Sequence, residues 1–207
     1  PKNQRHMRTF LNVLSLDTQI TILINSFFGE NIFIDSGFQI LANDYFFPVI
    51  SALSLFFLWF SGVNKNMRLL NQKLVVAGLF SIVFSNLLVF LFNLIWERSR
   101  PFEIYSDSIN LLFYPSTDPS FPSNPVLVCT GIFMVIFKFK KSFGIIGLFL
   151  TLIFGISKVY VGVAFISDIF IAIILGMILG LLCYRFVIFF SRYFNTLFKW
   201  IRIFGLA

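Results

Sequence analysis

Five apolar runs, each of about the length needed to cross a bilayer core of roughly 30 Å, occupy most of this chain and limit the folds open to it. Apolar residues make up 58% of the sequence, and 31 residues are Phe, which is far more than one soluble core of 207 residues can bury. The sequence therefore predicts an all-α integral membrane protein, a bundle of about five transmembrane helices. We place the spans at Tyr45 to Ser61, Leu74 to Ile95, Val126 to Phe137, Phe143 to Ile156 and Val163 to Phe190.

A further apolar segment, Phe10 to Phe28, is interrupted by polar residues. Asp17, Thr18 and Gln19 lie in its middle, and the apolar stretch after them is too short to cross a membrane. We interpret this segment as an amphipathic helix lying in the interface, with a sixth span as the alternative.

The chain is predicted to form one membrane domain over residues 1–207. Residues 1–44 would hold the tail and the interfacial helix, 45–190 the helical bundle, and 191–207 a basic C-terminal tail. Cys129 and Cys183 both fall within apolar runs, where a free thiol behaves as a small apolar group, and no disulfide is expected. We expect neither a metal site nor a cofactor.

Charged residues are distributed unevenly between the loops on the two sides of the predicted bundle. One side carries ten basic residues and no acid, whereas the other carries Arg98, Arg100 and Lys158 against seven acids. Cytoplasmic loops are rich in Lys and Arg, so we expect a multi-pass protein of the cell membrane with its C-terminus cytoplasmic and the second side extracytoplasmic. The net charge of +7 then belongs to the cytoplasmic face and requires no nucleic-acid partner. The ten basic residues are Lys65, Arg68, Lys73, Lys138, Lys140, Lys141, Arg185, Arg192, Lys199 and Arg202.

Three segments with polar and basic side chains emerge on the extracytoplasmic side. They are Arg100-Pro101, the run 120–125 (Ser-Phe-Pro-Ser-Asn-Pro), and Ser157-Lys158 with Asp168 ten residues further on. Guanidinium groups chelate phosphate oxygens, and a helix N-terminus offers unpaired N–H donors. Each segment alone has an ordinary explanation as a loop dipeptide, a helix cap or a snorkelling Lys. As an ordered set at one depth, they predict an anion-binding pocket.

These three segments resemble the signature motifs of the type-2 phosphatidic acid phosphatase superfamily. The chain is most similar to its smaller undecaprenyl-diphosphate phosphatases of the bacitracin-resistance type, and the resemblance runs from about Asp17 to the end of the fifth span. It implies a helical bundle with a phosphate pocket at the outer membrane surface, supplied with lipid phosphates from the leaflet. The phosphate-binding residues that it implies are Arg100, Ser123, Asn124, Ser157 and Lys158.

The chain departs from the family pattern at the residues that perform the chemistry. The only histidine is His6, near the N-terminus. The second motif should end in the His that protonates the leaving alkoxide, and Pro125 stands there. In the third motif, the nucleophilic His is replaced by Ala164 and the Arg by Lys158, while the orienting carboxylate, Asp168, is retained. The first motif's Lys is Asn93, a loss also found in undecaprenyl-type members.

These departures favour a protein that binds its ligand without hydrolysing it. General acid catalysis alone contributes about a hundred to ten-thousand-fold, and Pro125 and Ala164 supply neither an acid nor a nucleophile. We therefore expect a pseudoenzyme that binds a polyprenyl phosphate or another lipid phosphate, with membrane lipids around it and a membrane protein as a possible partner. Two alternatives remain open. One is an active phosphatase that uses unconventional residues such as Ser123, Cys129 or Asp168. The other is a purely structural subunit in which Asp168 pairs with Lys158 or Arg100.

Overall fold

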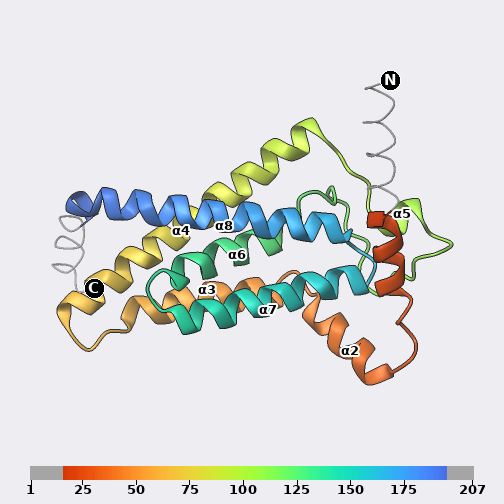
Figure 1. Ribbon diagram of the computed structural model, residues 1–207, viewed down its shortest axis with the longest axis horizontal. Helices are drawn as coiled ribbons and strands as arrows, with labels where there is room; N and C mark the ends of the chain where they lie inside the picture. The colour runs from red at the N-terminus through yellow and green to blue at the C-terminus, as the bar shows by residue number, and fades with distance from the viewer. Residues whose placement is uncertain (1–15, 195–207) are drawn as a thin grey trace.

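The computed structural model describes residues 16–194, and all regular structure in that range is helical. Five longer helices lie along the long axis of the molecule (Figure 1): α3 (Phe46–Phe60), α4 (Lys65–Ile95), α6 (Asn124–Phe137), α7 (Lys141–Tyr160) and α8 (Ile166–Phe189). At one end lie α2 (Ile32–Leu41), the short α5 (Pro101–Ile104) and a helical segment over residues 16–25. His6, the first part of the Phe10 to Phe28 segment and the tail beyond residue 194 lie outside the described residues.

Each predicted span corresponds to one of the five longer helices, and the all-helical membrane fold is confirmed. By length and apolar composition, α4, α7 and α8 can each cross a membrane, and α2 with α3 forms a fourth span if that pair, bent by 52°, is counted as one. The remaining helix, α6, is apolar but has only 14 residues. Five helices therefore correspond to the five predicted spans, but α6 is shorter than the length expected of a membrane-crossing helix.

Two features of the helices differ from the prediction. Helix α4 begins at Lys65 rather than Leu74, because the polar residues before Leu74 continue the helix beyond its apolar part. Helix α2 was not expected as a separate element. Its N-cap is Asn31, whose side chain accepts hydrogen bonds from the backbone N–H groups of Phe33 and Ile34 at 3.0 and 3.4 Å.

The short helix α6 occupies the centre of the bundle and packs against α3, α4, α7 and α8. Its close contact with α8 depends on small residues. A Cβ atom on Gly176 would lie 2.6 Å from the carbonyl oxygen of Leu127, and one on Gly180 would lie 2.6 Å from that of Gly131. The backbones of the two helices therefore touch, which fixes the N-terminus of α6 relative to the first turn of α8.

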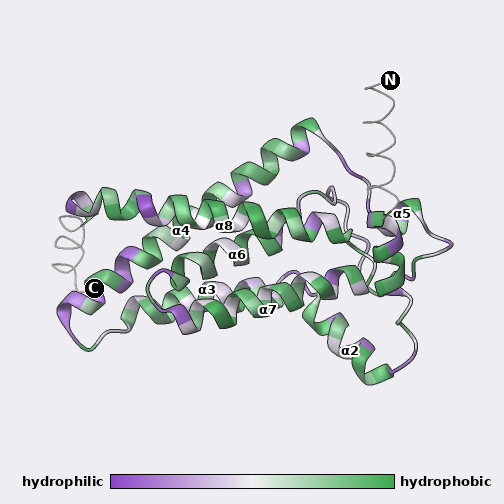
Figure 2. Cartoon of the chain, viewed as in Figure 1, coloured by the Kyte–Doolittle hydropathy of each residue, from purple (hydrophilic) through white to green (hydrophobic). Residues whose placement is uncertain are grey.

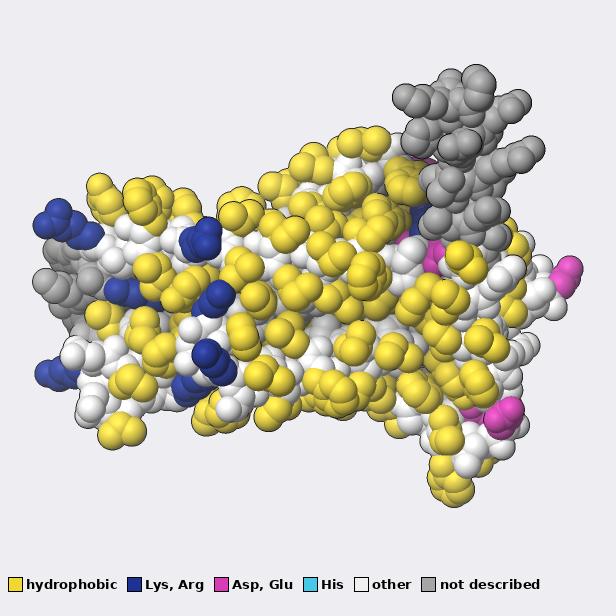
Figure 3. Space-filling view, in the orientation of Figure 1, with side chains coloured by type: hydrophobic (Ala, Val, Ile, Leu, Met, Phe, Trp, Pro, Cys, Tyr) yellow, Lys and Arg dark blue, Asp and Glu magenta, His cyan; other side chains and the backbone are white. Residues whose placement is uncertain are grey.

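The charged residues separate toward the two ends of the bundle. Hydrophobic side chains cover the sides of the helices, while Lys and Arg gather at one end and Asp and Glu at the other (Figures 2 and 3). We call the end that carries α2, α5 and the loops 96–123 and 161–165 the motif end, because the three predicted segments meet there.

Hydrogen bonds from the N-terminal part of the chain close the motif end. The side chain of Asn25 donates to the carbonyl oxygens of Asn110 and Tyr160 at 3.0 and 2.8 Å, and accepts from the Asn110 N–H at 2.8 Å. The Tyr160 hydroxyl donates to Asp35 Oδ1 at 2.5 Å. These bonds join the segment 16–25, α2, the loop before α6 and the end of α7, so the loops around the site rest on a fixed frame.

Candidate phosphate-binding site

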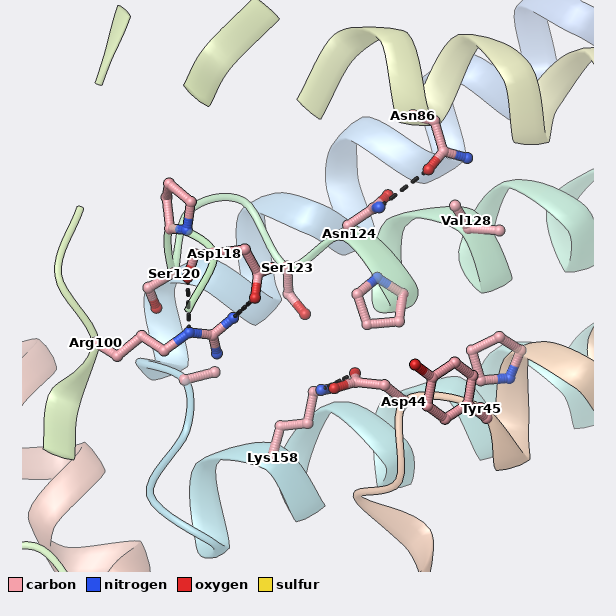
Figure 4. Close-up of a pocket in the computed structure, with 14 residues that line it drawn as sticks. Asp44, Tyr45, Asn86, Arg100, Asp118, Ser120, Ser123, Asn124, Val128 and Lys158 are labelled. Carbon is pink, nitrogen blue, oxygen red and sulfur yellow. Dashed lines mark hydrogen bonds and ion pairs between the residues drawn. The ribbon is translucent and has the colours of Figure 1, made fainter. Parts of the chain in front are cut away.

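The three predicted segments meet around a cavity of about 390 Å³ at the motif end (Figure 4). The linker between α2 and α3 supplies Asp44, and the loop before α6 supplies Asp118, Ser120 and Ser123. The four charged side chains that line the cavity are Asp44, Arg100, Asp118 and Lys158. Its other lining residues are Tyr45, Pro48, Asn86, Pro119, Ser120, Ser123, Asn124, Pro125, Val128 and Ala164.

Arg100 is held by the backbone on both sides of the cavity. Its Nε donates to the Asp118 carbonyl oxygen at 2.9 Å, and its Nη1 donates to the Val163 carbonyl oxygen at 2.7 Å. Its Nη2 forms an ion pair with Asp118 Oδ1 at 3.0 Å. The side chain therefore links the loop before α6 to the loop before α8, and its guanidinium plane is fixed at the cavity wall.

Lys158 reaches the cavity from the last turn of α7. The residue is 3% exposed, and its Nζ pairs with Asp44 Oδ1 and lies 5.5 Å from the centre of the Phe154 ring. A buried ammonium group needs a partner of opposite charge, and Asp44 provides it.

The N-terminus of α6 forms another wall of the cavity. Ser123 is the N-cap residue, and its side chain makes no capping hydrogen bond. Asn124 donates to Asn86 Oδ1 at 3.0 Å, while its own Oδ1 is buried and has no hydrogen-bond partner. The positive end of the helix dipole faces the cavity together with the two cations, an arrangement that attracts an anion.

Pro125 and Ala164 line the same cavity, from α6 and from the loop before α8. Neither side chain can ionise or donate a hydrogen bond. The cavity wall at these two positions therefore has no group for proton transfer or nucleophilic attack. Cys129 is fully buried in α6 and is not a lining residue, and both it and Cys183 are free thiols.

Two expectations about individual residues need correction. Ser157 does not line the cavity, because its hydroxyl is fully buried and donates to the Phe154 carbonyl oxygen at 2.7 Å within α7. Asp168 pairs with Arg98 and not with Lys158 or Arg100. The reason for the second difference is that both of the expected cations already have carboxylate partners from loops, Asp44 and Asp118.

Asp168 belongs to a separate buried cluster beside the cavity. Arg98 donates to both Asp168 Oδ1 and Ser167 Oγ through Nη1, the latter at 2.9 Å, and to Asp17 Oδ2 through Nη2 at 2.7 Å. Its guanidinium carbon also lies 4.1 Å from the centre of the Phe165 ring. Ser120 donates to Asp168 Oδ2, which accepts from the Phe165 N–H as well, at 3.3 Å. The carboxylate that would orient a histidine in the family is thus occupied by Arg98 and Ser120.

The sequence did not predict five residues as hydrogen-bond or ion-pair partners in this region. They are Asp17, Asp44, Arg98, Asp118 and Ser120. One signal was present, because Asp17 interrupts an apolar segment, and acids at the membrane edge are costly unless they are paired. Which cation each acid would meet depends on loops that are distant in sequence. Among residues 16–194, no group of three or more His, Cys, Asp or Glu side chains is placed to hold a metal ion.

Comparison with known proteins agrees with the predicted resemblance. A family profile described as "PAP2 superfamily" matches residues 74–192, more than half of the chain. The chain belongs to the PAP2 superfamily. Residues 74–192 include α6, α7 and α8 and the loops that carry all three motifs.

One relative supports the predicted similarity to bacitracin-resistance proteins. The chain is 27% identical over 130 residues to the bacitracin transport permease protein BcrC of Bacillus licheniformis. The aligned region covers 63% of this chain and 61% of that protein, so the chain spans less than two thirds of its relative's length.

Two solved structures share the fold. Aquifex aeolicus LpxE superimposes with a TM-score of 0.64 at 23% identity, covering 81% of this chain and 93% of that one. The PAP2-type phosphatidylglycerolphosphate phosphatase of Bacillus subtilis superimposes with a TM-score of 0.60 at 23% identity, covering 84% and 86%. These likenesses establish the architecture of the bundle.

The Arg98 cluster gives a prediction about stability. Replacing Arg98 by Met leaves Asp168 and Asp17 without their cation in a buried setting, so we expect a loss of roughly 3–5 kcal/mol in the free energy of unfolding. Denaturant unfolding in detergent micelles measures it. Adding Asp168→Asn to that variant removes the unpaired charge and should recover part of the loss.

The matched control is Arg185→Met, which removes an exposed arginine near the C-terminus of α8. Its stability should stay within about 0.5 kcal/mol of the original protein. An Arg98→Met protein as stable as the Arg185→Met protein would contradict the assigned role.

Proposed function

We propose that this protein is a catalytically inactive PAP2 protein that binds a polyprenyl phosphate or another lipid phosphate at the motif end. The observation that carries the proposal is that Pro125 and Ala164 line one cavity together with Arg100, Ser123 and Lys158. The groups suited to holding phosphate oxygens are therefore present where the groups for phosphoryl transfer are absent. Such a protein would present its lipid to a membrane partner or regulate that partner.

The dimensions and charges of the cavity support binding. A volume of about 390 Å³ falls in the usual range for small-ligand sites. Arg100 donates to two backbone carbonyl groups that hold it in place, so its guanidinium loses little conformational freedom when it donates to phosphate oxygens as well.

A second candidate, a purely structural membrane subunit, is favoured by a different observation. Lys158 and Arg100 each have an acid partner within the protein, so neither cation requires a ligand for charge balance. A third candidate is hydrolysis by unconventional residues. Of the three residues considered for it, only Ser123 lines the cavity, since Cys129 is buried elsewhere and Asp168 is held by Arg98.

The proposal predicts an absence of turnover. The purified protein should release no phosphate from undecaprenyl diphosphate, phosphatidic acid or phosphatidylglycerol phosphate above a no-enzyme blank, because it lacks both the acid and the nucleophile. A phosphate-release assay measures this. Robust release that Ser123→Ala abolishes would establish the third candidate instead.

Restoring the missing groups should create activity. The combination Pro125→His, Ala164→His and Lys158→Arg places an acid and a nucleophile in the cavity lining, from α6 and from the loop before α8, together with Arg100 and the N-terminus of α6. We expect a rate on the order of a hundredfold above the unmodified protein, limited by the loss of the proline in the first turn of α6.

The single substitutions serve as controls and should remain near the blank, because acid and nucleophile act as a unit. A folded triple variant that binds lipid phosphate without hydrolysing it would show that the cavity no longer has the geometry for transfer. One that neither binds nor hydrolyses would favour the structural candidate.

The same proposal includes an orientation, with the motif end extracytoplasmic and the C-terminus cytoplasmic in the inner membrane. The support is the concentration of Lys and Arg at the opposite end (Figure 3). Asn110 is exposed in the loop before α6, and its hydrogen bonds to the rest of residues 16–194 are made by its backbone, so Asn110→Cys keeps those contacts. With Cys129 and Cys183 replaced, this cysteine should react with an impermeant maleimide in intact cells. Labelling only after lysis would show that the motif end faces the cytoplasm instead.

A further inference from the structure

The charges that line the cavity sum to zero. Two cations, Arg100 and Lys158, face two carboxylates, Asp44 and Asp118, and these are the only charged side chains among the lining residues that the structure describes. A site for a bare phosphate is expected to be electropositive. The two carboxylates therefore need an explanation.

The four charges lie at two depths. The side chains of Lys158 and Arg100 are 4% and 10% exposed, whereas those of Asp44 and Asp118 are 36% and 65% exposed. The cations thus lie on the inner wall and the carboxylates lie toward the mouth. A ligand that enters this cavity meets positive charge at its inner part and negative charge at its outer part.

Each carboxylate is engaged through only one of its two oxygens. Asp44 and Asp118 accept from their cations through Oδ1. Within residues 16–194, no donor reaches the Oδ2 atom of either residue. Neither Oδ2 atom is among the buried side-chain atoms that lack a partner, so both are accessible. Two acceptor oxygens with negative charge are therefore available near the mouth.

These carboxylates act differently on two classes of ligand. A phosphate monoester or a diphosphate brings only negative charge, so it is repelled by both carboxylates and competes with them for the cations. A phosphate that also carries an ammonium group brings both charges. It can place its phosphate oxygens against the cations while its ammonium donates to the unused carboxylate oxygens. Every charge in the cavity then has a partner of opposite sign.

We propose that the cavity selects a lipid phosphate whose headgroup also carries a primary amine, as phosphoethanolamine does. Its phosphate oxygens lie against Lys158 and Arg100, and its terminal ammonium lies against Asp44 and Asp118. In such a headgroup the phosphate is nearer the lipid chains and the amine is outermost, which matches the order of cations and carboxylates in the cavity. This inference rests on the proposed function, because it presupposes that a lipid phosphate binds there.

The test compares two soluble short-chain lipids, one of which carries an ethanolamine group on its phosphate while the other ends in the phosphate itself. Dihexanoyl phosphatidylethanolamine and dihexanoyl phosphatidic acid are titrated into the full chain in detergent micelles by calorimetry. We expect the ethanolamine lipid to bind about tenfold more tightly, the ratio expected from one charge-assisted hydrogen bond. Asp44→Asn and Asp118→Asn should each reduce this ratio toward one, by weakening binding of the ethanolamine lipid and strengthening that of phosphatidic acid.

The matched control is Asp107→Asn. Asp107 is an exposed acid on the loop that follows α5 and does not line the cavity, so this variant has the same change in net charge and should keep the original ratio. Asp118 is largely exposed, so its substitution remains informative even if Asp44→Asn does not fold. Lys158→Gln should weaken binding of both lipids.

The outcomes separate the two proposals. If phosphatidic acid binds as tightly as the ethanolamine lipid and the two carboxylate variants leave the ratio unchanged, the headgroup inference is overturned while lipid-phosphate binding stands. If neither lipid binds, the headgroup inference is overturned, and the proposed function fails with it when a polyprenyl phosphate titrated in the same way does not bind either.

Discussion

A charge that leaves water at the membrane edge must meet an opposite charge, and the motif end of this protein is arranged around that requirement. Arg98 joins Asp17 to Asp168, Arg100 pairs with Asp118, and Lys158 pairs with Asp44. Arg100 and Asp118 belong to the same connection between α4 and α6, whereas the partners in the other pairs are distant in sequence. The ion pairs therefore do more than compensate charge, since they connect the N-terminal segment, the loops and the ends of α7 and α8 into one frame.

The cavity exists because of where α6 lies. Its position in the centre of the bundle, in backbone contact with α8 at Gly176, places its N-terminus beside the loop before α8. Arg100 then spans from the loop before α6 to the Val163 carbonyl oxygen. A short central helix and one buried arginine thus bring the second and third motifs together, whether or not the site performs catalysis.

Asp168 is held in place by residues other than a histidine. Asp168 has no histidine to orient, yet it remains fully buried because Arg98 and Ser120 satisfy its oxygens and it accepts from the N–H of Phe165 at the start of α8. Retention of this aspartate therefore has a structural reason that is independent of turnover.

The sequence by itself determined the class of fold and the family. Long apolar runs admit only a helical membrane bundle, since backbone groups in lipid must be hydrogen-bonded within the chain, and the ordered motifs are local in sequence. Through the family resemblance it also predicts that Pro125 and Ala164 stand where the family has its histidines. Only the tertiary structure decided the partners of Asp168, Lys158 and Arg100, the exclusion of Ser157 from the cavity, and the separate helix α2. The physical reason is that ion pairing acts between loops far apart in sequence, and the competition of several acids for three cations is settled by their positions in space.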